Sequence, residues 1–239
     1  MRDAAPPSLD TTFEALSQGA PIVVLAPHPD DESLGCGALL AQAFATGTGA
    51  RVVCLTDGSA SHRGSRLYPP RRLAALRRLE LEEAVARLGG GREQILWLGL
   101  KDAQTERSMK VQAVIRLMTR TCLGLGARSL FAPLATDPHG DHRTAAAIAC
   151  EVAARAGMRH FGYPIWTRWQ RPDFRETLAA WTEHQLPLGP HAARKRAAID
   201  AHRSQLGPLI DDATEAFCLD PAFVEELSTG PELYYEIPR

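Results

Sequence analysis

The chain has 239 residues, 45% apolar and 23% charged, which is enough for one domain to bury a core without disulfides or structural metals. Its formal net charge of -1 excludes a whole-protein field that would attract nucleic acid or an anionic membrane. No apolar run approaches the ~18 residues of a membrane helix, and the N-terminus lacks the layout of a signal peptide. A cytoplasmic protein with no integral membrane segment is the simplest interpretation.

Four short apolar runs without strict alternation are typical of strands that are covered on both faces. They span residues 22–26, 51–56, 94–98 and 129–132. Helical stretches are predicted at residues 33–46, 69–88, 106–123 and 143–156. This βαβαβαβα order predicts an α/β fold with a Rossmann-like, doubly wound, mostly parallel sheet in a three-layer α/β/α arrangement.

The segment from about 160 to 190 departs from this pattern. Its run FGYPIWTRWQRPDF combines aromatic residues with two prolines, and we expect an irregular loop excursion here. After it, residues 192–206 are predicted to be helical, Asp220 and Pro221 to begin a short helix, and residues 233–237 to form a terminal strand. No repeat or long linker interrupts the chain, so residues 1–239 are interpreted as one domain.

A polar motif, Pro27-His28-Pro29-Asp30-Asp31-Glu32, follows the first predicted strand directly. Its two prolines oppose regular structure. A histidine and three carboxylates in a loop beside the core would repel one another and lose hydration unless a cation or solvent compensates them. Because imidazole nitrogen and carboxylate oxygen are both zinc ligands, a metal is the natural compensator.

A second motif, Asp137-Pro138-His139-Gly140-Asp141-His142, follows the fourth predicted strand and also precedes a helix. In a doubly wound sheet the strand after the topological switch commonly lies beside the first strand, and ligands bind where the connections diverge. We therefore expect the two loops to converge. Each aspartate taken alone could be a helix cap, and each histidine an ordinary surface or core residue. Two such loops at strand ends favour a metal site.

The two motifs, His28 to Glu32 and His139 to His142, resemble those of the PIG-L/LmbE-like de-N-acetylases, which include N-acetylglucosaminyl-phosphatidylinositol deacetylase and the deacetylases of mycothiol and bacillithiol synthesis. Four further segments match the family pattern: Leu55 to Gly58, Arg77-x-x-Glu80, Leu98 to Asp102, and Lys195 to Gln205. The resemblance implies a zinc-dependent hydrolase that removes an N-acyl group, typically N-acetyl, from an amino sugar or its conjugate. The region of about 160–190 is variable in the family and is expected to determine the substrate.

The resemblance also implies roles for six residues. The zinc ligands would be His28, Asp31 and His142. Asp30 would be the general base, His139 would stabilise the oxyanion or protonate the leaving amine, and Asp141 would orient His139. Three protein ligands leave a coordination position for water, whose pKa a zinc site can lower to ~7. Fe²⁺ or another divalent ion also suits this ligand set, because such sites are weakly selective.

Other side chains near the motifs have two interpretations each. Glu32 is expected to cap the following helix or to bind a backbone amide. Arg77 and Asp102 are candidate contacts to sugar hydroxyls; the alternatives are a surface ion pair between Arg77 and Glu80, and a capping role for Asp102. Trp166 and Trp169 could form a stacking wall for a sugar, a small satellite core or an oligomer contact, which leaves self-association open.

Three rival functions remain at this stage. A metal-dependent hydrolase of another amide or ester would share the same nucleophile. A nucleotide-binding Rossmann domain would need a glycine-rich turn where this chain has the PHPDDE motif. A non-catalytic metal scaffold would need neither Asp30 nor His139. The small-molecule hydrolase remains the best interpretation.

Overall fold

The computed structural model describes residues 8–238, and its centre is an eight-stranded sheet in the order β1-β8-β10-β7-β6-β2-β3-β5. These strands are β1 (Ser8–Asp10), β8 (Thr182–Leu186), β10 (Glu232–Ile237), β7 (Arg159–Tyr163), β6 (Ser129–Pro133), β2 (Ile22–Ala26), β3 (Ala50–Thr56) and β5 (Ile95–Leu100). Only β10 runs antiparallel to its neighbours in this sheet. The predicted mostly parallel sheet is confirmed.

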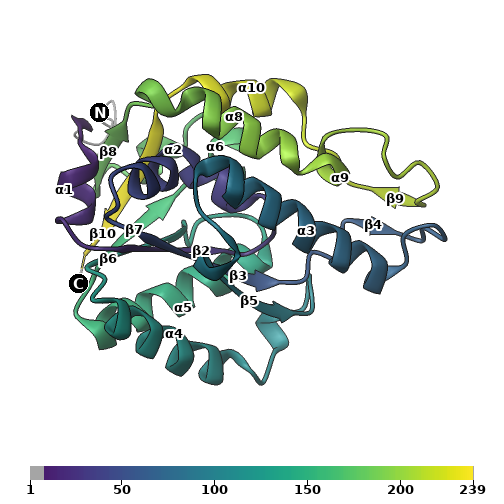
Figure 1. The fold of residues 1–239 in the computed structure, drawn as a ribbon, viewed down its shortest axis with the longest axis horizontal. Helices are drawn as coiled ribbons and strands as arrows, with labels where there is room; N and C mark the ends of the chain where they lie inside the picture. Colours follow the sequence, from purple (N-terminus) through teal and green to yellow (C-terminus); the bar gives the residue numbers. More distant parts are fainter. Residues whose placement is uncertain (1–7, 239) are drawn as a thin grey trace.

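Helices cover both faces of the sheet, as the three-layer prediction requires (Figure 1). On one face lie α2 (Asp31–Ala45), α3 (Pro70–Leu88), α8 (Ala192–Ala201) and α10 (Pro221–Thr229), and on the other lie α4 (Val111–Leu125) and α5 (Gly140–Ala156). Successive residues of β2 enter different cores: Ile22 and Val24 face the α2 side, whereas Val23 and Leu25 face the α4 and α5 side. A strand buried on both faces must be apolar at every position, which explains the continuous runs in the sequence.

The predicted adjacency of the first and fourth sequence strands is confirmed. β6 pairs with β2 in parallel, with Val23 opposite Leu130 and Val24 opposite Phe131. The carboxyl ends of the two strands therefore lie at the same edge of the sheet, and the loops that follow them start side by side. This is the switch point at which doubly wound sheets bind ligands.

The expectation of an irregular excursion at 160–190 is wrong. This stretch contains β7, two short helices, α6 (Trp166–Gln170) and α7 (Phe174–Thr177), and β8. Pro164 follows the last residue of β7, so it marks the end of a strand. Aromatic residues here fill the core: Phe161 is fully buried and its ring stacks on Phe131 at 5.0 Å.

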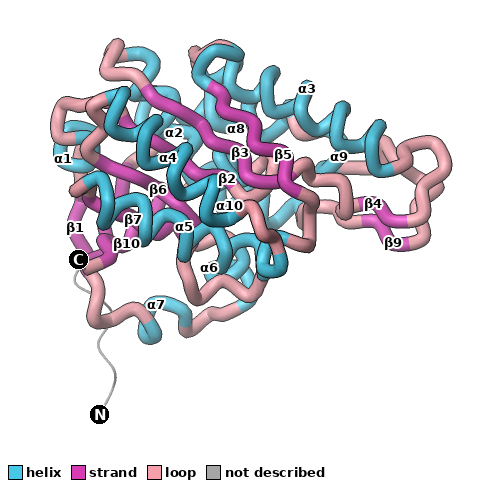
Figure 2. The backbone as a smooth tube through the Cα atoms, turned by 90° about the horizontal axis from the view of Figure 1, so that it is seen from below, coloured by secondary structure: helices cyan, strands magenta, loops and turns pink. Residues whose placement is uncertain are grey.

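A second, two-stranded sheet was not predicted. It joins β4 (His62–Arg63) to β9 (Glu215–Ala216) in antiparallel pairing, and Figure 2 shows this ribbon projecting away from the main sheet. Strands of two residues carry no periodic pattern that a sequence could reveal. The remaining elements are the helices α1 (Phe13–Ser17) and α9 (Arg203–Leu206) and the 3-10 turns at Arg92–Gln94, Thr105–Arg107 and Gly189–His191. Within residues 8–238 no helix has the length and apolar character needed to cross a membrane.

Candidate metal centre and active site

Both predicted motifs lie at the carboxyl edge of the sheet. The first occupies the turn between β2 and α2, where the Pro27 carbonyl accepts hydrogen bonds from the Thr56 backbone N–H at 2.9 Å and from Thr56 Oγ1 at 2.8 Å. The second occupies the connection from β6 to α5. Because β2 and β6 are neighbours, the two motifs converge as expected.

The three predicted metal ligands meet around the Asp31 carboxylate. Asp31 Oδ2 lies 3.3 Å from His28 Nδ1 and 3.3 Å from His142 Nε2. His142 is fully buried, and each of its ring nitrogens lies 3.3 Å from a carboxylate oxygen, of Asp31 or of Asp137, without the geometry of a hydrogen bond. A cation between two imidazole nitrogens and a carboxylate oxygen would satisfy the nitrogen that faces Asp31. This donor set therefore fits a divalent metal such as zinc.

Carboxylates flank the opposite nitrogen of each histidine. His28 Nε2 lies 3.2 Å from both Asp102 Oδ1 and Asp141 Oδ2, and His142 Nδ1 lies 3.3 Å from Asp137 Oδ2. Such outer carboxylates fix the tautomer and orientation of metal-binding imidazoles. They leave His28 Nδ1 and His142 Nε2 as the nitrogens that face Asp31.

Further combinations of ligand atoms also cluster at His28. Potential ligand atoms of His28, His139 and His142 lie within 4.8 Å of one another, and so do those of His28, Asp102 and Asp141. Both combinations contain His28, the first also contains His142, and neither contains Asp31. The site is thus richer in donors than the three predicted ligands alone.

Asp137, the first residue of the second motif, is a functional candidate for which no role was predicted. It is buried, and its Oδ1 accepts a hydrogen bond from the His139 backbone N–H at 3.0 Å. Its Oδ2 accepts one from the Trp166 backbone N–H at 3.0 Å besides facing His142. The only signal in the sequence was an aspartate five residues before a candidate ligand histidine.

The predicted role of Asp141 in orienting His139 would not come from its side chain. Asp141 accepts hydrogen bonds from the Ala103 backbone N–H at 2.8 Å and from Thr105 Oγ1 at 2.5 Å, and it faces His28. Only its backbone N–H contacts His139, by donating to Nδ1 at 3.2 Å. The groups that donate to the Asp141 carboxylate lie in the loop after β5, so the spacing of residues within the second motif could not reveal them.

Asp30, the predicted base, has a strained backbone with φ 144° and ψ -33°. Strain of this kind costs about 1–3 kcal/mol and persists only where surrounding contacts impose it. Here Glu32 Oε2 accepts from the Asp30 backbone N–H at 3.0 Å, and Arg77 Nη2 donates to Asp30 Oδ2 at 2.9 Å and to the Pro29 carbonyl at 2.8 Å. The prediction that Glu32 binds a backbone amide is confirmed. Burial raises the pKa of Asp30 to about 6, although Arg77 opposes the change.

Arg77 is 3% exposed and lines the same cavity as the motifs. The alternative of a surface ion pair with Glu80 is wrong, because Glu80 is itself buried and accepts hydrogen bonds from the Ser204 backbone N–H and Oγ at 2.8 and 2.6 Å. Arg77 also donates to the Gly58 carbonyl at 3.0 Å. A side chain at Gly58 would collide with the guanidinium, since a Cβ there would lie 2.7 Å from Arg77 Nη1. This close approach explains the glycine in the Leu55 to Gly58 segment.

His139 lies at the N-terminus of α5, half-buried, with its ring centroid 4.7 Å from that of His28. Because its Nδ1 accepts the Asp141 N–H, its proton in the neutral form sits on Nε2. Burial and the nearby imidazoles of His28 and His142 lower the pKa of His139 below its ordinary value. His139 is therefore a neutral hydrogen-bond donor at pH 7.

A cavity of about 510 Å³ opens above these residues. Its polar lining includes residues of both motifs together with Arg77 and Asp102. Trp166 and Gln170 of α6 and Phe217 next to β9 line it as well. Trp166 and Trp169 both pack against Phe223 of the main core, with ring centroids 5.2 and 5.0 Å apart, so the satellite core is wrong and the stacking wall stays a prediction.

Comparison with known proteins identifies a family for this chain. A sequence model of the PIG-L family, described as GlcNAc-PI de-N-acetylase, matches residues 23–153. A comparison with curated proteins found no match.

Several solved structures share the fold. N,N'-diacetylchitobiose deacetylase from Pyrococcus horikoshii has a TM-score of 0.65 at 23% identity, covering 91% of this chain and 84% of that one. The conserved protein TT1542 from Thermus thermophilus has a TM-score of 0.61 at 25% identity, covering 86% and 84%. GalB, the 4-carboxy-2-hydroxymuconate hydratase from Pseudomonas putida, has a TM-score of 0.69 at only 14% identity, covering 92% and 97%.

The GalB likeness demonstrates that this fold also supports another reaction, so the fold alone does not assign an activity. The family match is more specific, because it covers more than half of the chain and contains both motifs. The chain therefore belongs to the PIG-L family and is a hydrolytic N-deacetylase.

Proposed function

We propose that the protein is a zinc-dependent de-N-acetylase of an amino sugar or an amino-sugar conjugate, with Asp30 as general base. The observation that carries this proposal is the convergence of His28 Nδ1 and His142 Nε2 on Asp31 Oδ2, beside Asp30. The family match and the acetylated disaccharide in the name of the Pyrococcus structure support an amino-sugar substrate.

In this proposal His28, Asp31 and His142 hold the zinc, which supplies a Lewis acid for the amide carbonyl and for a water molecule. Arg77 holds Oδ2 of Asp30, which leaves Oδ1 to accept the proton of the attacking water. A base whose pKa lies near the working pH transfers protons most efficiently, and burial raises the pKa of Asp30 in that direction.

His139, whose ring centroid lies 4.7 Å from that of His28 and 5.2 Å from that of His142, would stabilise the oxyanion. Its Nε2–H can donate a hydrogen bond to the carbonyl oxygen as negative charge develops there. Because the pKa of His139 is lowered, its ring holds no extra proton to give to the leaving amine at pH 7. The proton for the departing amine would therefore come from Asp30, which has just received it from water.

The region of about 160–190 would contribute to substrate choice, since Trp166 and Gln170 line the cavity. This role is consistent with a single domain over residues 1–239, because β7 and β8 on either side of it belong to the main sheet.

The test separates metal binding from proton transfer. We expect Asp30→Asn to retain the metal but to lose about 10²- to 10⁴-fold in amine release from N-acetylated sugars, whereas His142→Ala loses the metal itself. His191→Ala, in the 3-10 turn at Gly189–His191, is the control and keeps both. Elemental analysis of the purified variants identifies the ion as zinc or iron.

Two outcomes would contradict parts of the proposal. Equal metal loss in Asp30→Asn and His142→Ala would refute their separate roles. A metal-loaded protein that releases no amine from a panel of N-acetylated sugars and sugar conjugates would refute the amino-sugar substrate.

A further inference from the structure

The peptide bond between Pro29 and Asp30 is held at both of its polar groups. Its carbonyl oxygen accepts a hydrogen bond from Arg77 Nη2 at 2.8 Å, and its N–H donates to Glu32 Oε2 at 3.0 Å. The carbonyl of Asp30 itself accepts from two backbone N–H groups in the first turn of α2, at 3.0 and 2.9 Å. Because the peptide groups on both sides of its Cα are held, the Asp30 backbone stays at its strained φ of 144°.

Glu32 is held in turn by a histidine from a distant part of the chain. His202 lies between α8 and α9, and its Nε2 is 2.9 Å from Glu32 Oε1. Since an ionised carboxylate only accepts hydrogen bonds, the His202 ring is the donor. Ser33 Oγ donates to the same oxygen at 2.6 Å. Glu32 is fully buried and His202 is 1% exposed, so these contacts take the place of water in fixing the direction of the carboxylate.

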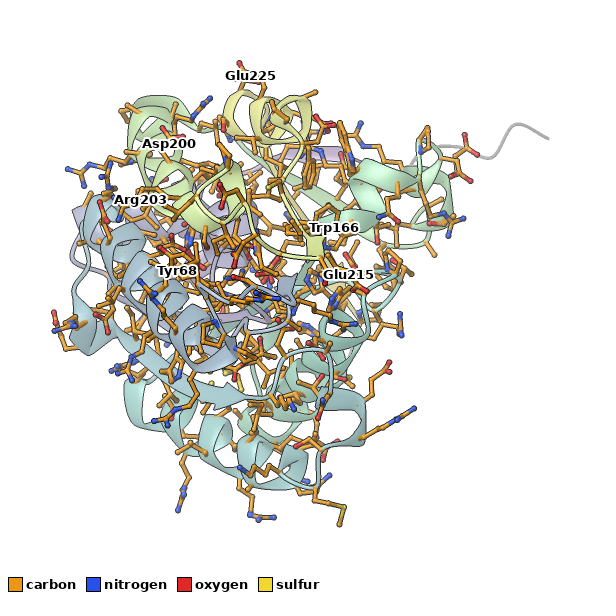
Figure 3. All side chains as sticks on the ribbon, turned by 90° about the vertical axis from the view of Figure 1, so that its right-hand side faces the viewer. Tyr68, Trp166, Asp200, Arg203, Glu215 and Glu225 are labelled. Atoms are coloured by element: carbon orange, nitrogen blue, oxygen red, sulfur yellow. The ribbon has the colours of Figure 1, made fainter. Side chains whose placement is uncertain are left out.

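The turn that carries His202 is anchored on α3. Glu80, which is buried, accepts hydrogen bonds from the backbone N–H and Oγ of Ser204 at 2.8 and 2.6 Å. Figure 3 shows Arg203, the residue between His202 and Ser204, beside α3. Glu80 follows Arg77 by three residues, so the two side chains share the buried face of this helix. One helix therefore anchors both supports of the peptide bond before the general base.

The hydrolysis described above gives His202 no part. We propose that His202 is a positioning residue for the general base, acting on the Asp30 backbone through the Glu32 carboxylate. Its effect on the reaction follows from distance, because a misplacement of about 1 Å can lower the rate by about 10²-fold. With the Asp30 backbone and Oδ2 both held, Oδ1 keeps one direction toward the attacking water. This inference rests on the proposed deacetylase function.

The test is a double-mutant cycle between His202 and Asp30. Amine release is measured with whichever of N-acetylglucosamine and N,N'-diacetylchitobiose wild type cleaves faster. We expect His202→Leu to lower kcat roughly 10- to 100-fold with KM and metal content unchanged, because the base is displaced while the metal ligands stay. In the Asp30→Asn background the same substitution should cost little, since no base remains to be positioned. A side chain that only stabilised the fold would cost the same in both backgrounds.

Milder variants and a control accompany the cycle. His202→Gln retains an N–H donor near the position of Nε2 and is expected to recover most of kcat. Ser33→Ala removes the other side-chain donor to Glu32, and it should lower kcat several-fold and serve in the cycle if His202→Leu folds poorly. The matched control is His160→Leu, which removes a buried histidine of β7 outside the cavity lining and should leave kcat unchanged. Thermal unfolding of each variant confirms that its fold is intact.

A crystal structure of His202→Leu tests the same arrangement without turnover. We expect Asp30 to leave the positive-φ region as Glu32 turns away, and an unchanged Asp30 backbone would overturn the inference. Equal kcat losses in the wild-type and Asp30→Asn backgrounds would also overturn it and would leave the deacetylase function standing. Release of no amine from any sugar or conjugate would contradict the deacetylase function, whereas the crystal structure would still decide whether His202 holds the Asp30 backbone.

Discussion

Lys195→Met tests how the helix that begins with Asp31 is held. α2 is broken at Cys36, whose φ of -136° and ψ of 18° are not helical. Glu232 enters this break and accepts hydrogen bonds from the backbone N–H groups of Ala38 and Leu39 at 2.8 and 2.9 Å.

Lys195 contacts both Glu232 and the part of α2 before the break. Its Nζ donates to Glu232 Oε1 at 2.7 Å and to the Leu34 carbonyl at 2.9 Å, and Lys195 is only 1% exposed and Glu232 2%. Removing one partner of a buried ion pair costs about 3–5 kcal/mol, because an uncompensated charge stays buried. The remaining donors to Glu232, two amides and the Tyr234 hydroxyl, reduce this cost. We therefore expect Lys195→Met to lower the free energy of unfolding by about 3 kcal/mol.

The assay is urea unfolding, with the midpoint and slope compared among variants. Adding Glu232→Gln to Lys195→Met removes the orphaned charge and is expected to recover part of the loss, which a double-mutant cycle measures as coupling. The matched control is Arg196→Met, since Arg196 pairs with Asp200 at the surface at 3.0 Å and such pairs contribute about 1 kcal/mol or less. A loss below about 1 kcal/mol for Lys195→Met, or strict additivity in the cycle, would refute the reasoning.

Two further predictions concern pH and metal affinity. Burial lowers the pKa of His160 to about 4. Between pH 6.5 and 4 the unfolded chain therefore takes up a proton that the folded chain does not. As the pH is lowered through this range, the free energy of unfolding decreases by at most about 3 kcal/mol. His160→Phe should flatten this part of the pH profile in urea unfolding, and an unchanged profile would contradict the assignment. Asp137→Asn should weaken metal binding about 10- to 100-fold by loosening His142, measured by chelator competition; unchanged affinity would mean that Asp137 does not orient the ligand.

Much of the site followed from the sequence because it depends on chain order and local chemistry. Strand order places β6 beside β2, so two motifs about a hundred residues apart had to meet at one edge. The crowding of His28 with three carboxylates required compensation whatever the detailed geometry.

The missed features depend on contacts that spacing does not encode. Asp141 turns toward His28 because Ala103 and Thr105, in a loop after another strand, provide its donors. The ribbon of β4 and β9 pairs segments about 150 residues apart through two residues each, so neither half carries a pattern by itself. The prediction for the 160–190 region was wrong for another reason, because its prolines lie at the ends of elements that aromatic burial stabilises.

The network around Lys195 and the metal centre stabilise the same helix by different means. At the centre, the Asp31 carboxylate lies 3.3 Å from a ring nitrogen of both His28 and His142. A metal that binds these groups only in the folded chain adds stability that rises with its concentration, about 2.7 kcal/mol at one hundred times its Kd. The Lys195 and Glu232 pair contacts none of these groups directly, so its contribution should be the same with and without chelator. Stability lost by chelation and stability lost by Lys195→Met should therefore add, because the first belongs to the beginning of α2 and the second to its break at Cys36.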